Sequence, residues 1–231
     1  MISIKNLNQS YGSSQILWDV NLEIEQGACI CLMGRNGVGK TTFLKSLMGL
    51  LPTNSGEMIF EQTPLHKKSV ETRAYMGIGY VPQGRDIFPL LTVEENLRVG
   101  LAGRRDGVKE IPEKVYELFP VLKEMLGRRG GDLSGGQQQQ LAIGRALVTD
   151  PKVLILDEPN EGIQPNIVKQ IGDVIIKLNQ EDGLTVILVE QKLGFAKKVG
   201  EYFYLMEKGR IVASDKMKNL SEDLIKQHLA V

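Results

Sequence analysis

The stretch Gly34-Arg35-Asn36-Gly37-Val38-Gly39-Lys40-Thr41 decides how the rest of this chain is interpreted. It follows the apolar residues 28–33, which are typical of a buried strand, and precedes residues 42–48, which are typical of a helix. This order of strand, glycine-rich loop and helix is the context that the pattern G-x-x-x-x-G-K-[ST] requires. The sequence therefore predicts a phosphate-binding loop.

The residue types of this loop suit a polyphosphate. Backbone N–H groups can point inward where side chains are small, and Gly37 and Gly39 can take the positive φ that such a wrap needs. The helix that follows directs its positive end to the same place. We expect Lys40 to reach the β- and γ-phosphates and the Thr41 hydroxyl to hold Mg²⁺. The alternative, a glycine-rich turn with a solvated lysine, leaves the flanking strand and helix unexplained.

Composition bounds the class of protein. The chain has 231 residues, enough for one sizeable domain, and its 28 basic and 28 acidic residues cancel. No overall field therefore favours nucleic acid or anionic lipid. No apolar run is long enough to span a membrane, and residues 1–5 do not resemble the start of a secretory signal.

The two cysteines, Cys29 and Cys31, lie on the strand predicted before the loop. Residues at i and i+2 of a strand share a face and are poorly placed to bridge each other. We therefore expect reduced thiols in a cytosolic core. His66 and His228 offer no recognisable cluster of metal ligands.

Two carboxylates follow the apolar residues 153–156, which are typical of a strand in a parallel sheet. Open α/β sheets bind ligands at the carboxyl ends of their strands, so Asp157 and Glu158 are site candidates rather than surface residues. Adjacent strand residues point to opposite faces, which predicts different roles. Asp157 suits Mg²⁺, and Glu158 suits a general base that polarises the attacking water.

The middle of the chain leans toward helix. Thr92 and Glu95 form a capping-box pattern, and apolar residues that most simply form ordinary core then recur at helical spacing: Val115, Leu118, Phe119, Leu122 and Met125.

A further helix is predicted from Gln137 to about Val148, and Gly135 and Gly136 at its start expose N–H groups that could bind an anion. The four glutamines at 137–140 are expected to form a polar face of this helix.

The ends of the chain add strands. Residues 2–7 and 16–24 are predicted strands, and Tyr11 between them is either a packed loop aromatic or a residue that stacks on a nucleotide base. An amphipathic helix at 166–180, a buried strand at 184–189 and a hairpin at 202–213 complete the pattern.

Three segments occur together in this order: the phosphate loop, Leu133-Ser134-Gly135-Gly136-Gln137, and Leu154-Ile155-Leu156-Asp157-Glu158-Pro159. This combination resembles the nucleotide-binding subunit of ABC transporters over essentially the whole chain. The resemblance implies one ABC ATPase domain at residues 1–231. Its fold would be α/β: a P-loop NTPase core of mostly parallel sheet with flanking helices, an N-terminal antiparallel β lobe, and a helical subdomain at about 85–130.

The resemblance also implies ATP and Mg²⁺ as ligands. Nucleotide-binding positions would be Tyr11, Gly34, Arg35, Asn36, Gly37, Val38, Gly39, Lys40, Thr41, Thr42, Ser134, Gly135, Gly136 and Gln137. Metal-binding positions would be Thr41, Gln83 and Asp157, and catalytic positions would be Glu158, Gln191 and Gln83.

The implied assembly is a head-to-tail dimer with two ATP molecules between the cassettes, in which Ser134, Gly136 and Gln137 contact the γ-phosphate held by the other cassette. The partner cassette would be a second copy or a paired paralogue. The helical subdomain would dock on integral membrane permease subunits at the cytoplasmic face of the inner membrane. A periplasmic solute-binding protein would take part indirectly, and nucleic acid would not.

Two positions depart from the family pattern. Gln191 stands where the family has a switch histidine, and a glutamine can donate a hydrogen bond but cannot carry a proton charge at neutral pH. Either Gln191 keeps a positioning role or the hydrolysis rate is low. Gln164 replaces a usual aspartate, so contacts across the dimer must differ in detail.

Further segments narrow the resemblance. Val189-Glu190-Gln191 and residues 84–97 look like the branched-chain amino acid and urea importer branch. Within it, residues 7–12, 16–20 and 161–165 look closer to the subunit for urea or a short amide. We therefore expect the ATPase subunit of a urea or short-amide importer, with a branched-chain amino acid importer as the alternative. A soluble ABC ATPase acting on nucleic acid is disfavoured by the neutral charge, and a small-molecule kinase would have no use for Leu133-Ser134-Gly135-Gly136.

Overall fold

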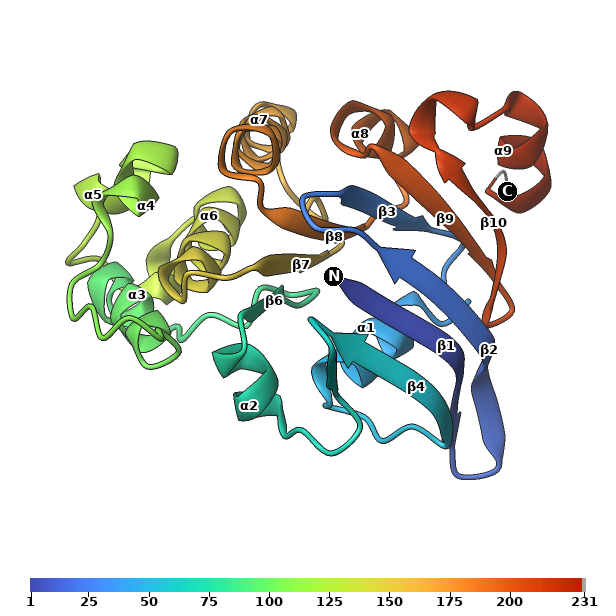
Figure 1. Cartoon of the computed structure of the whole chain (residues 1–231). Helices are drawn as coiled ribbons and strands as arrows, with labels where there is room; N and C mark the ends of the chain where they lie inside the picture. Colours follow the sequence, from blue (N-terminus) through green and yellow to red (C-terminus); the bar gives the residue numbers. More distant parts are fainter. Residues whose placement is uncertain (230–231) are drawn as a thin grey trace.

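The computed structural model describes residues 1–229, which form two sheets packed around a shared helix (Figure 1). The smaller sheet is antiparallel with the order β2-β1-β4-β5, and the larger sheet has the order β10-β9-β3-β8-β7-β6. In the larger sheet every neighbouring pair is parallel except β9 with β10. The predicted α/β fold, with an antiparallel N-terminal lobe and a mostly parallel sheet, is confirmed.

The smaller sheet consists of β1 (Ile2–Tyr11), β2 (Ser14–Ile24), β4 (Ser55–Phe60) and β5 (Thr63–Pro64). The larger sheet consists of β3 (Cys29–Met33), β6 (Ile78–Val81), β7 (Val153–Asp157), β8 (Thr185–Val189), β9 (Tyr202–Glu207) and β10 (Arg210–Lys216). The helices beside the sheets are α1 (Lys40–Met48), α2 (Val70–Tyr75), α6 (Gly135–Val148), α7 (Pro165–Asp182) and α8 (Leu193–Val199). At one end of the molecule lie α3 (Val93–Leu101), α4 (Glu113–Leu118), α5 (Pro120–Glu124) and the 3₁₀ turn η1 (Gly130–Asp132). The chain continues after β10 through η2 (Met217–Asn219) to α9 (Glu222–His228).

One apolar core joins α1 to both sheets. Phe43 and Leu47 of α1 are fully buried in it together with Ile4 of β1. Ile30 and Leu32 of β3 face the same core from the larger sheet. The helix that begins at the phosphate loop is therefore held from two sides, which fixes the loop at its start.

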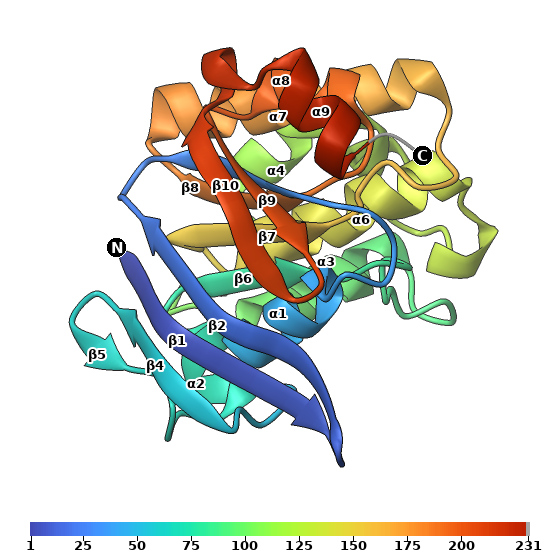
Figure 2. The same ribbon diagram turned by 90° about the vertical axis from the view of Figure 1, so that its right-hand side faces the viewer.

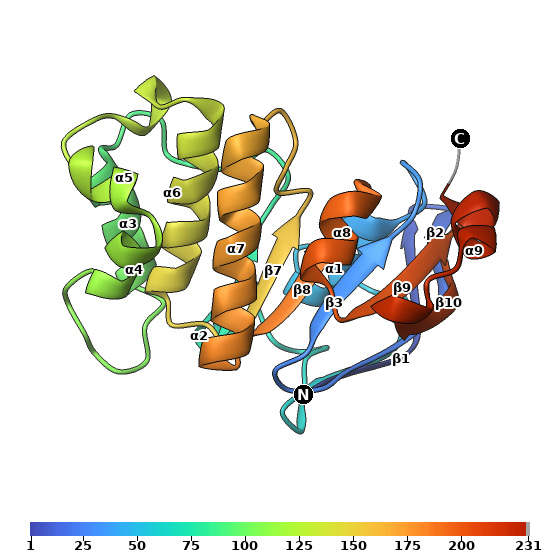
Figure 3. The ribbon, with the colours of Figure 1, turned by 90° about the horizontal axis from the view of Figure 1, so that it is seen from above.

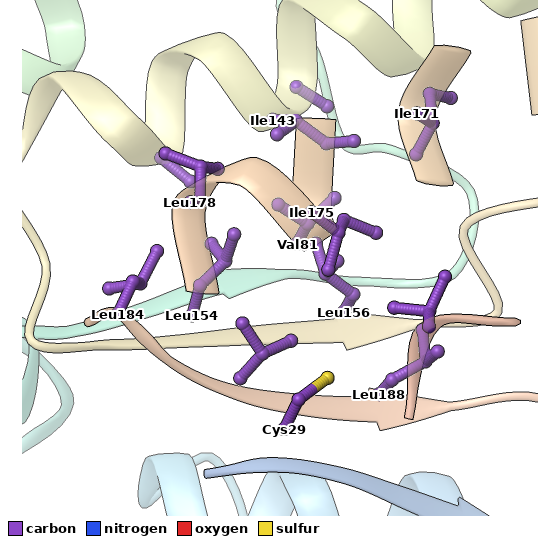
Figure 4. Packing of buried hydrophobic residues seen from close by; sticks show 14 of the residues in the cluster. Cys29, Val81, Ile143, Leu154, Leu156, Ile171, Ile175, Leu178, Leu184 and Leu188 are labelled. Carbon is purple, nitrogen blue, oxygen red and sulfur yellow. The ribbon is translucent and has the colours of Figure 1, made fainter. Parts of the chain in front are cut away.

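The second core lies on the other face of the larger sheet, beneath α6, α7 and α8, which run side by side in Figure 3. Figure 4 shows Ile171, Ile175 and Leu178 of α7 above Leu154 and Leu156 of β7. The spacing of three and four residues on α7 is the amphipathic stripe that the sequence predicts. Because both faces of β7 are covered, its residues are apolar without alternation.

Strand β3 divides its side chains between the two cores. Cys29 and Cys31 face the helices α6 to α8, and Ile30 and Leu32 face α1. Both thiols are buried and free, as expected for a pair at i and i+2. Burial raises the pKa of Cys29 to about 12 and also raises that of Cys31.

The helical end of the molecule begins with the predicted capping box. The capping box of Thr92 and Glu95 at the start of α3 is confirmed, and the residues from 113 to 124 form two short helices. The break falls at Phe119, whose backbone is non-helical, because Pro120 has no N–H and restricts the residue before it.

Helix α6 also corrects the sequence interpretation. It begins at Gly135 rather than Gln137, and its glutamines do not all form a polar face, because Gln139 and Gln140 are buried. The Gln140 amide donates to Gln170 Oε1 of α7 over 3.3 Å. The prediction was wrong because α6 is enclosed by neighbouring helices, and single-helix periodicity carries no information about such neighbours.

The hairpin of β9 and β10 lies against the start of the chain, and Figure 2 shows it beside β2. The Trp18 N–H of β2 donates to the Gly209 carbonyl over 2.9 Å. The parallel pairing of β9 with β3 was not predicted from the sequence. Within residues 1–229, no helix combines the length and the apolar character needed to cross a bilayer.

Candidate functional site

The loop at residues 34–39 connects β3 to α1 at the carboxyl end of the larger sheet. Gly37 and Gly39 have φ values of 77° and 111°, where residues with a side chain are strained. A Cβ at Gly39 would lie 3.1 Å from Leu17 Cδ2, so β2 packs closely against the loop. No side chain of the described residues caps the N-terminus of α1, so its first N–H groups point toward the loop.

Lys40 is buried at the start of α1 with its ammonium inside the loop. Its Nζ donates to the Gly34 carbonyl over 2.8 Å and to the Arg35 carbonyl over 2.9 Å. It lies 3.8 Å from Glu158 Oε1. Burial lowers the pKa of Lys40, and the carboxylates of Glu158 and Asp157 oppose that shift. The result is a cation held inside a glycine-rich loop, where a phosphate oxygen can reach it.

Asp157 is the last residue of β7 and only 1% of its surface is exposed. Neither carboxylate oxygen has a hydrogen-bond partner among residues 1–229. Burial raises the pKa of Asp157, and the Thr41 hydroxyl, which lies close by without meeting hydrogen-bond geometry, opposes part of the shift. Buried carboxylate oxygens without partners are the donor set that a hard cation such as Mg²⁺ prefers. Asp157 and the Thr41 hydroxyl therefore fit a magnesium ion.

Glu158 lies outside the strand, which corrects the reasoning from strand alternation. Strand β7 ends at Asp157, and Glu158 turns away from it with a φ of 48°. Its N–H donates to the Val189 carbonyl of β8 over 3.0 Å. The Gln191 amide donates to Glu158 Oε1 and to Asn36 Oδ1, each over 2.5 Å. Gln191 thus lies between the carboxylate and the phosphate loop.

Gln83 follows β6, and its amide donates to Glu161 Oε2 over 3.0 Å. A cleft of about 430 Å³ opens between these residues and the phosphate loop. Its lining consists of Ile16, Asn36, Gly37, Gly39, Lys40, Thr41, Thr42, Gln83, Glu158 and Glu161. Side chains from the ends of different strands therefore converge on one opening at the carboxyl edge of the sheet.

A second cavity of about 570 Å³ lies where β7 and β8 begin. Four of its charged side chains pair with one another, Lys114 with Asp182 and Lys152 with Glu61, each over 2.5 Å. It contains none of the predicted site residues, so the cleft at the phosphate loop is the candidate site.

The predicted signature residues do not line that cleft. Ser134 caps α6, and Gln137 completes a capping box with it. Arg85 links this helix to the edge of the cleft, because it donates to Gln138 Oε1 over 3.2 Å and to the Glu161 carbonyl over 3.1 Å.

The lining within residues 1–229 also omits six predicted positions: Tyr11, Gly34, Arg35, Val38, Asp157 and Gln191. Tyr11 ends β1 at the hairpin to β2, and 48% of its surface is exposed. The carbonyl groups of Gly34 and Arg35 hold Lys40, as described above. The Val38 carbonyl accepts the N–H of Gly209 over 2.9 Å, which joins the loop to the β9–β10 turn.

Sequence reasoning missed two buried polar residues next to the cleft, Glu190 and Asn160. Glu190 directly follows β8, so it carries the same signal as Asp157: a carboxylate at the end of a buried strand. Asn160 comes two residues after Glu158, and its amide donates to Glu190 Oε2 over 2.6 Å.

A family model described as "ABC transporter" matches residues 17–161, which is more than half of the chain. The chain belongs to the ABC transporter family. The match runs from β2 through the phosphate loop and α6 to Glu161. This ABC ATPase therefore binds and hydrolyses ATP, and its fold is the ATP-binding cassette.

Two relatives cover nearly the whole ABC ATPase. The high-affinity branched-chain amino acid transport ATP-binding protein BraG of Pseudomonas aeruginosa is 44% identical, over 93% of this chain and 92% of BraG. The probable branched-chain amino acid transport ATP-binding protein LivF of Archaeoglobus fulgidus is 35% identical, over 96% of this chain and 94% of LivF. Among solved structures, a dimeric ATP-binding cassette in a post-hydrolysis state, bound to ADP and Pi, is 28% identical with a TM-score of 0.85, over 94% of this chain and 99% of that one.

Proposed function

We propose that this ABC ATPase powers an importer of branched-chain amino acids. The observation that carries the proposal is the 44% identity to BraG over 93% of the chain. LivF carries a related name and covers 96% of the chain. These relatives support the amino-acid alternative over the urea or short-amide importer that local sequence segments suggested, so urea remains the competing solute in the test.

The proposed chemistry is the hydrolysis of ATP in the cleft at the phosphate loop. Loop N–H groups and Lys40 bind the phosphates, and Thr41, Asp157 and Gln83 hold Mg²⁺. When bound, Mg²⁺ would neutralise charge on the phosphate oxygens. Glu158 accepts a proton from the attacking water as general base, which is typically worth ~10²–10⁴-fold.

Gln191 takes a positioning role in this proposal. Its amide already donates to Glu158 Oε1, so it orients the carboxylate without carrying a proton. Tyr11 is proposed to stack on the adenine base from the hairpin beside the loop, where its half-exposed ring is accessible.

The proposed working unit contains a second cassette. Ser134, Gly135, Gly136 and Gln137 do not line the cleft of their own chain, and the solved relative bound to ADP and Pi is a dimer. This supports a head-to-tail arrangement in which these residues contact the nucleotide of the partner cassette. Permease subunits would bind the helical part at about residues 85–130, which would place the chain at the cytoplasmic face of the membrane.

Uptake by cells tests both the solute and the chemistry. Cells that lack the gene are complemented with the wild-type chain or with Glu158→Gln, and uptake of labelled leucine and labelled urea is measured. We expect leucine uptake to return with the wild type only. Return of urea uptake alone would contradict the amino-acid proposal, and activity of Glu158→Gln equal to wild type would contradict the general base.

A further inference from the structure

A buried carboxylate joins the two turns that carry Glu158 and Gln191. Glu190 has 3% of its surface exposed and does not line the cleft. Its Oε1 accepts the backbone N–H groups of Gln191 and Lys192, each over 2.8 Å. Its Oε2 accepts the Asn160 amide over 2.6 Å. The carboxylate thus holds three donors, which is the compensation that a buried charge requires.

A second hydrogen bond connects the same two turns. The Lys192 ammonium donates to the Asn160 carbonyl over 3.1 Å. Asn160 therefore contacts the turn after β8 through its side chain and through its backbone. The strands themselves are neighbours, because Asp157 of β7 pairs with Val189 of β8. Together these contacts tie the turn at 158–161 to the turn at 190–192.

We propose that Glu190 and Asn160 are positioning residues for ATP hydrolysis, which hold Gln191 in hydrogen-bond contact with Glu158. The inference rests on the proposed role of Glu158 as general base. Glu190 acts through the backbone of Gln191, whose side chain in turn donates to Glu158 Oε1. Without the hydrogen bonds to Glu190, the 190–192 turn is no longer held in place. Displacement of a catalytic group by about 1 Å can lower a rate about a hundredfold.

An exchange of donor and acceptor tests this pair. In Glu190→Gln, one amide oxygen can accept the two backbone N–H groups, and the Asn160 amide can turn over so that its Oδ1, which has no partner among the described residues, accepts from the Gln NH₂. In Asn160→Asp, two carboxylates face each other. In the double variant the NH₂ of residue 190 donates to the carboxylate of residue 160, so the contact is restored in reverse. The net charge of the double variant equals that of the wild type, and Lys192 stays beside the relocated carboxylate.

The chain is purified with the subunits that copurify with it, and three quantities are measured for each variant: kcat for ATP hydrolysis, affinity for ATP and Tm. We expect Asn160→Asp to lower kcat about tenfold or more and Glu190→Gln to lower it less, both with ATP affinity changed less than about threefold. The double variant should recover kcat to within about threefold of wild type. Recovery of kcat at unchanged ATP affinity is a readout that a purely structural role would not produce.

The opposite results are equally clear. An Asn160→Asp variant that hydrolyses ATP as fast as wild type would overturn the proposal. A double variant no faster than the slower single variant would also overturn it, provided that its Tm stays within a few degrees of the wild type. A double variant that loses Tm and ATP affinity together would show a structural role instead.

Glu158→Gln separates this inference from the proposed function. If Glu158→Gln hydrolyses ATP at the wild-type rate, the general base is wrong, and the positioning role is wrong with it. If Glu158→Gln is inactive and the double variant is not rescued, only the role of Glu190 and Asn160 is refuted.

Discussion

Asp157→Asn is expected to stabilise the nucleotide-free protein while weakening its response to Mg-ATP. Both carboxylate oxygens of Asp157 are buried without partners among the described residues. An unpaired buried polar group costs about 1–3 kcal/mol, and more if it is charged. The asparagine amide still has the cost of an unpaired neutral group but not the additional cost of a charge. We therefore expect Asp157→Asn to raise the free energy of unfolding by ~1–2 kcal/mol. For a chain of 231 residues this corresponds to a rise in Tm of about 2–8 °C.

With Mg-ATP bound, the wild type should have a higher Tm than Asp157→Asn. At a ligand concentration of 100 Kd, binding stabilises a protein by about 2.7 kcal/mol, or roughly 5–11 °C here. We expect Mg-ATP to raise the Tm of the wild type by this amount and that of Asp157→Asn by much less, because an amide is a poorer Mg²⁺ ligand than a carboxylate. The assay is thermal unfolding with EDTA and then with Mg-ATP. Asp132→Asn, which changes an exposed carboxylate, is the matched control and should leave both Tm values within about 1 °C.

The same carboxylate sets a pH dependence. Burial raises the pKa of Asp157 in the folded state above the value of 3.8 expected when unfolded. The folded state therefore keeps the proton over a window in which the unfolded state has lost it. The contribution of Asp157 to stability is complete below 3.8 and is lost as the pH rises through the folded pKa. In EDTA, the advantage of Asp157→Asn in urea unfolding should grow with pH across that window.

Two results would refute this reasoning. A Tm below wild type in EDTA would mean that Asp157 has favourable partners in the folded protein. A full thermal shift of Asp157→Asn with Mg-ATP would mean that Asp157 does not contribute to Mg²⁺ binding.

Three further predictions concern the scaffold. Arg73→Ala should lower the free energy of unfolding by about 3 kcal/mol or more in urea titrations, because the buried guanidinium donates to four backbone carbonyls beside α1 and α2. Gly209→Ala should destabilise the protein by at least about 1–3 kcal/mol in the same assay, because a Cβ there would lie 1.8 Å from the Ile16 carbonyl oxygen. Both cysteine thiols should resist iodoacetamide at pH 8 until the protein is denatured, because burial raises the pKa of Cys29 to about 12.

Each of these has its own check. Arg98→Ala removes an exposed arginine paired with Glu94 and should cost less than about 0.5 kcal/mol. If Arg73→Ala lowers the free energy of unfolding by as little as Arg98→Ala does, the role of Arg73 beside α1 is refuted. Wild-type stability of Gly209→Ala would show that the β9–β10 turn can shift. Labelling of a thiol in the folded protein would show that the core beneath α8 opens.

The parts of the site that the sequence predicted are those encoded by local patterns. Gly37 and Gly39 were expected to take positive φ, and they do. Asp157 was expected at the end of a buried strand, and it lies there. Such features depend on a few adjacent residues, so a single sequence suffices to find them.

The parts that it missed depend on which strands become neighbours. Glu190 and Asn160 lie 30 positions apart and meet because β7 pairs with β8. No pattern within a short stretch of sequence predicts that pairing. Burial of Gln139 follows in the same way from helices packed on α6. The separation of Asp157 and Glu158 was predicted for a wrong reason, because the chain turns at Glu158 instead of continuing as a strand.

The position of β3 has a consequence for the synthesis of this protein. The strand is complete at Met33, but its two sheet neighbours, β8 and β9, begin at Thr185 and Tyr202. At about 5–20 residues per second, the apolar strand waits roughly 8–35 s on the ribosome for β9. The phosphate loop waits longer still, because its contact from Gly209 arrives last. The phosphate loop thus obtains its full set of backbone contacts only after the chain has been synthesised past residue 209.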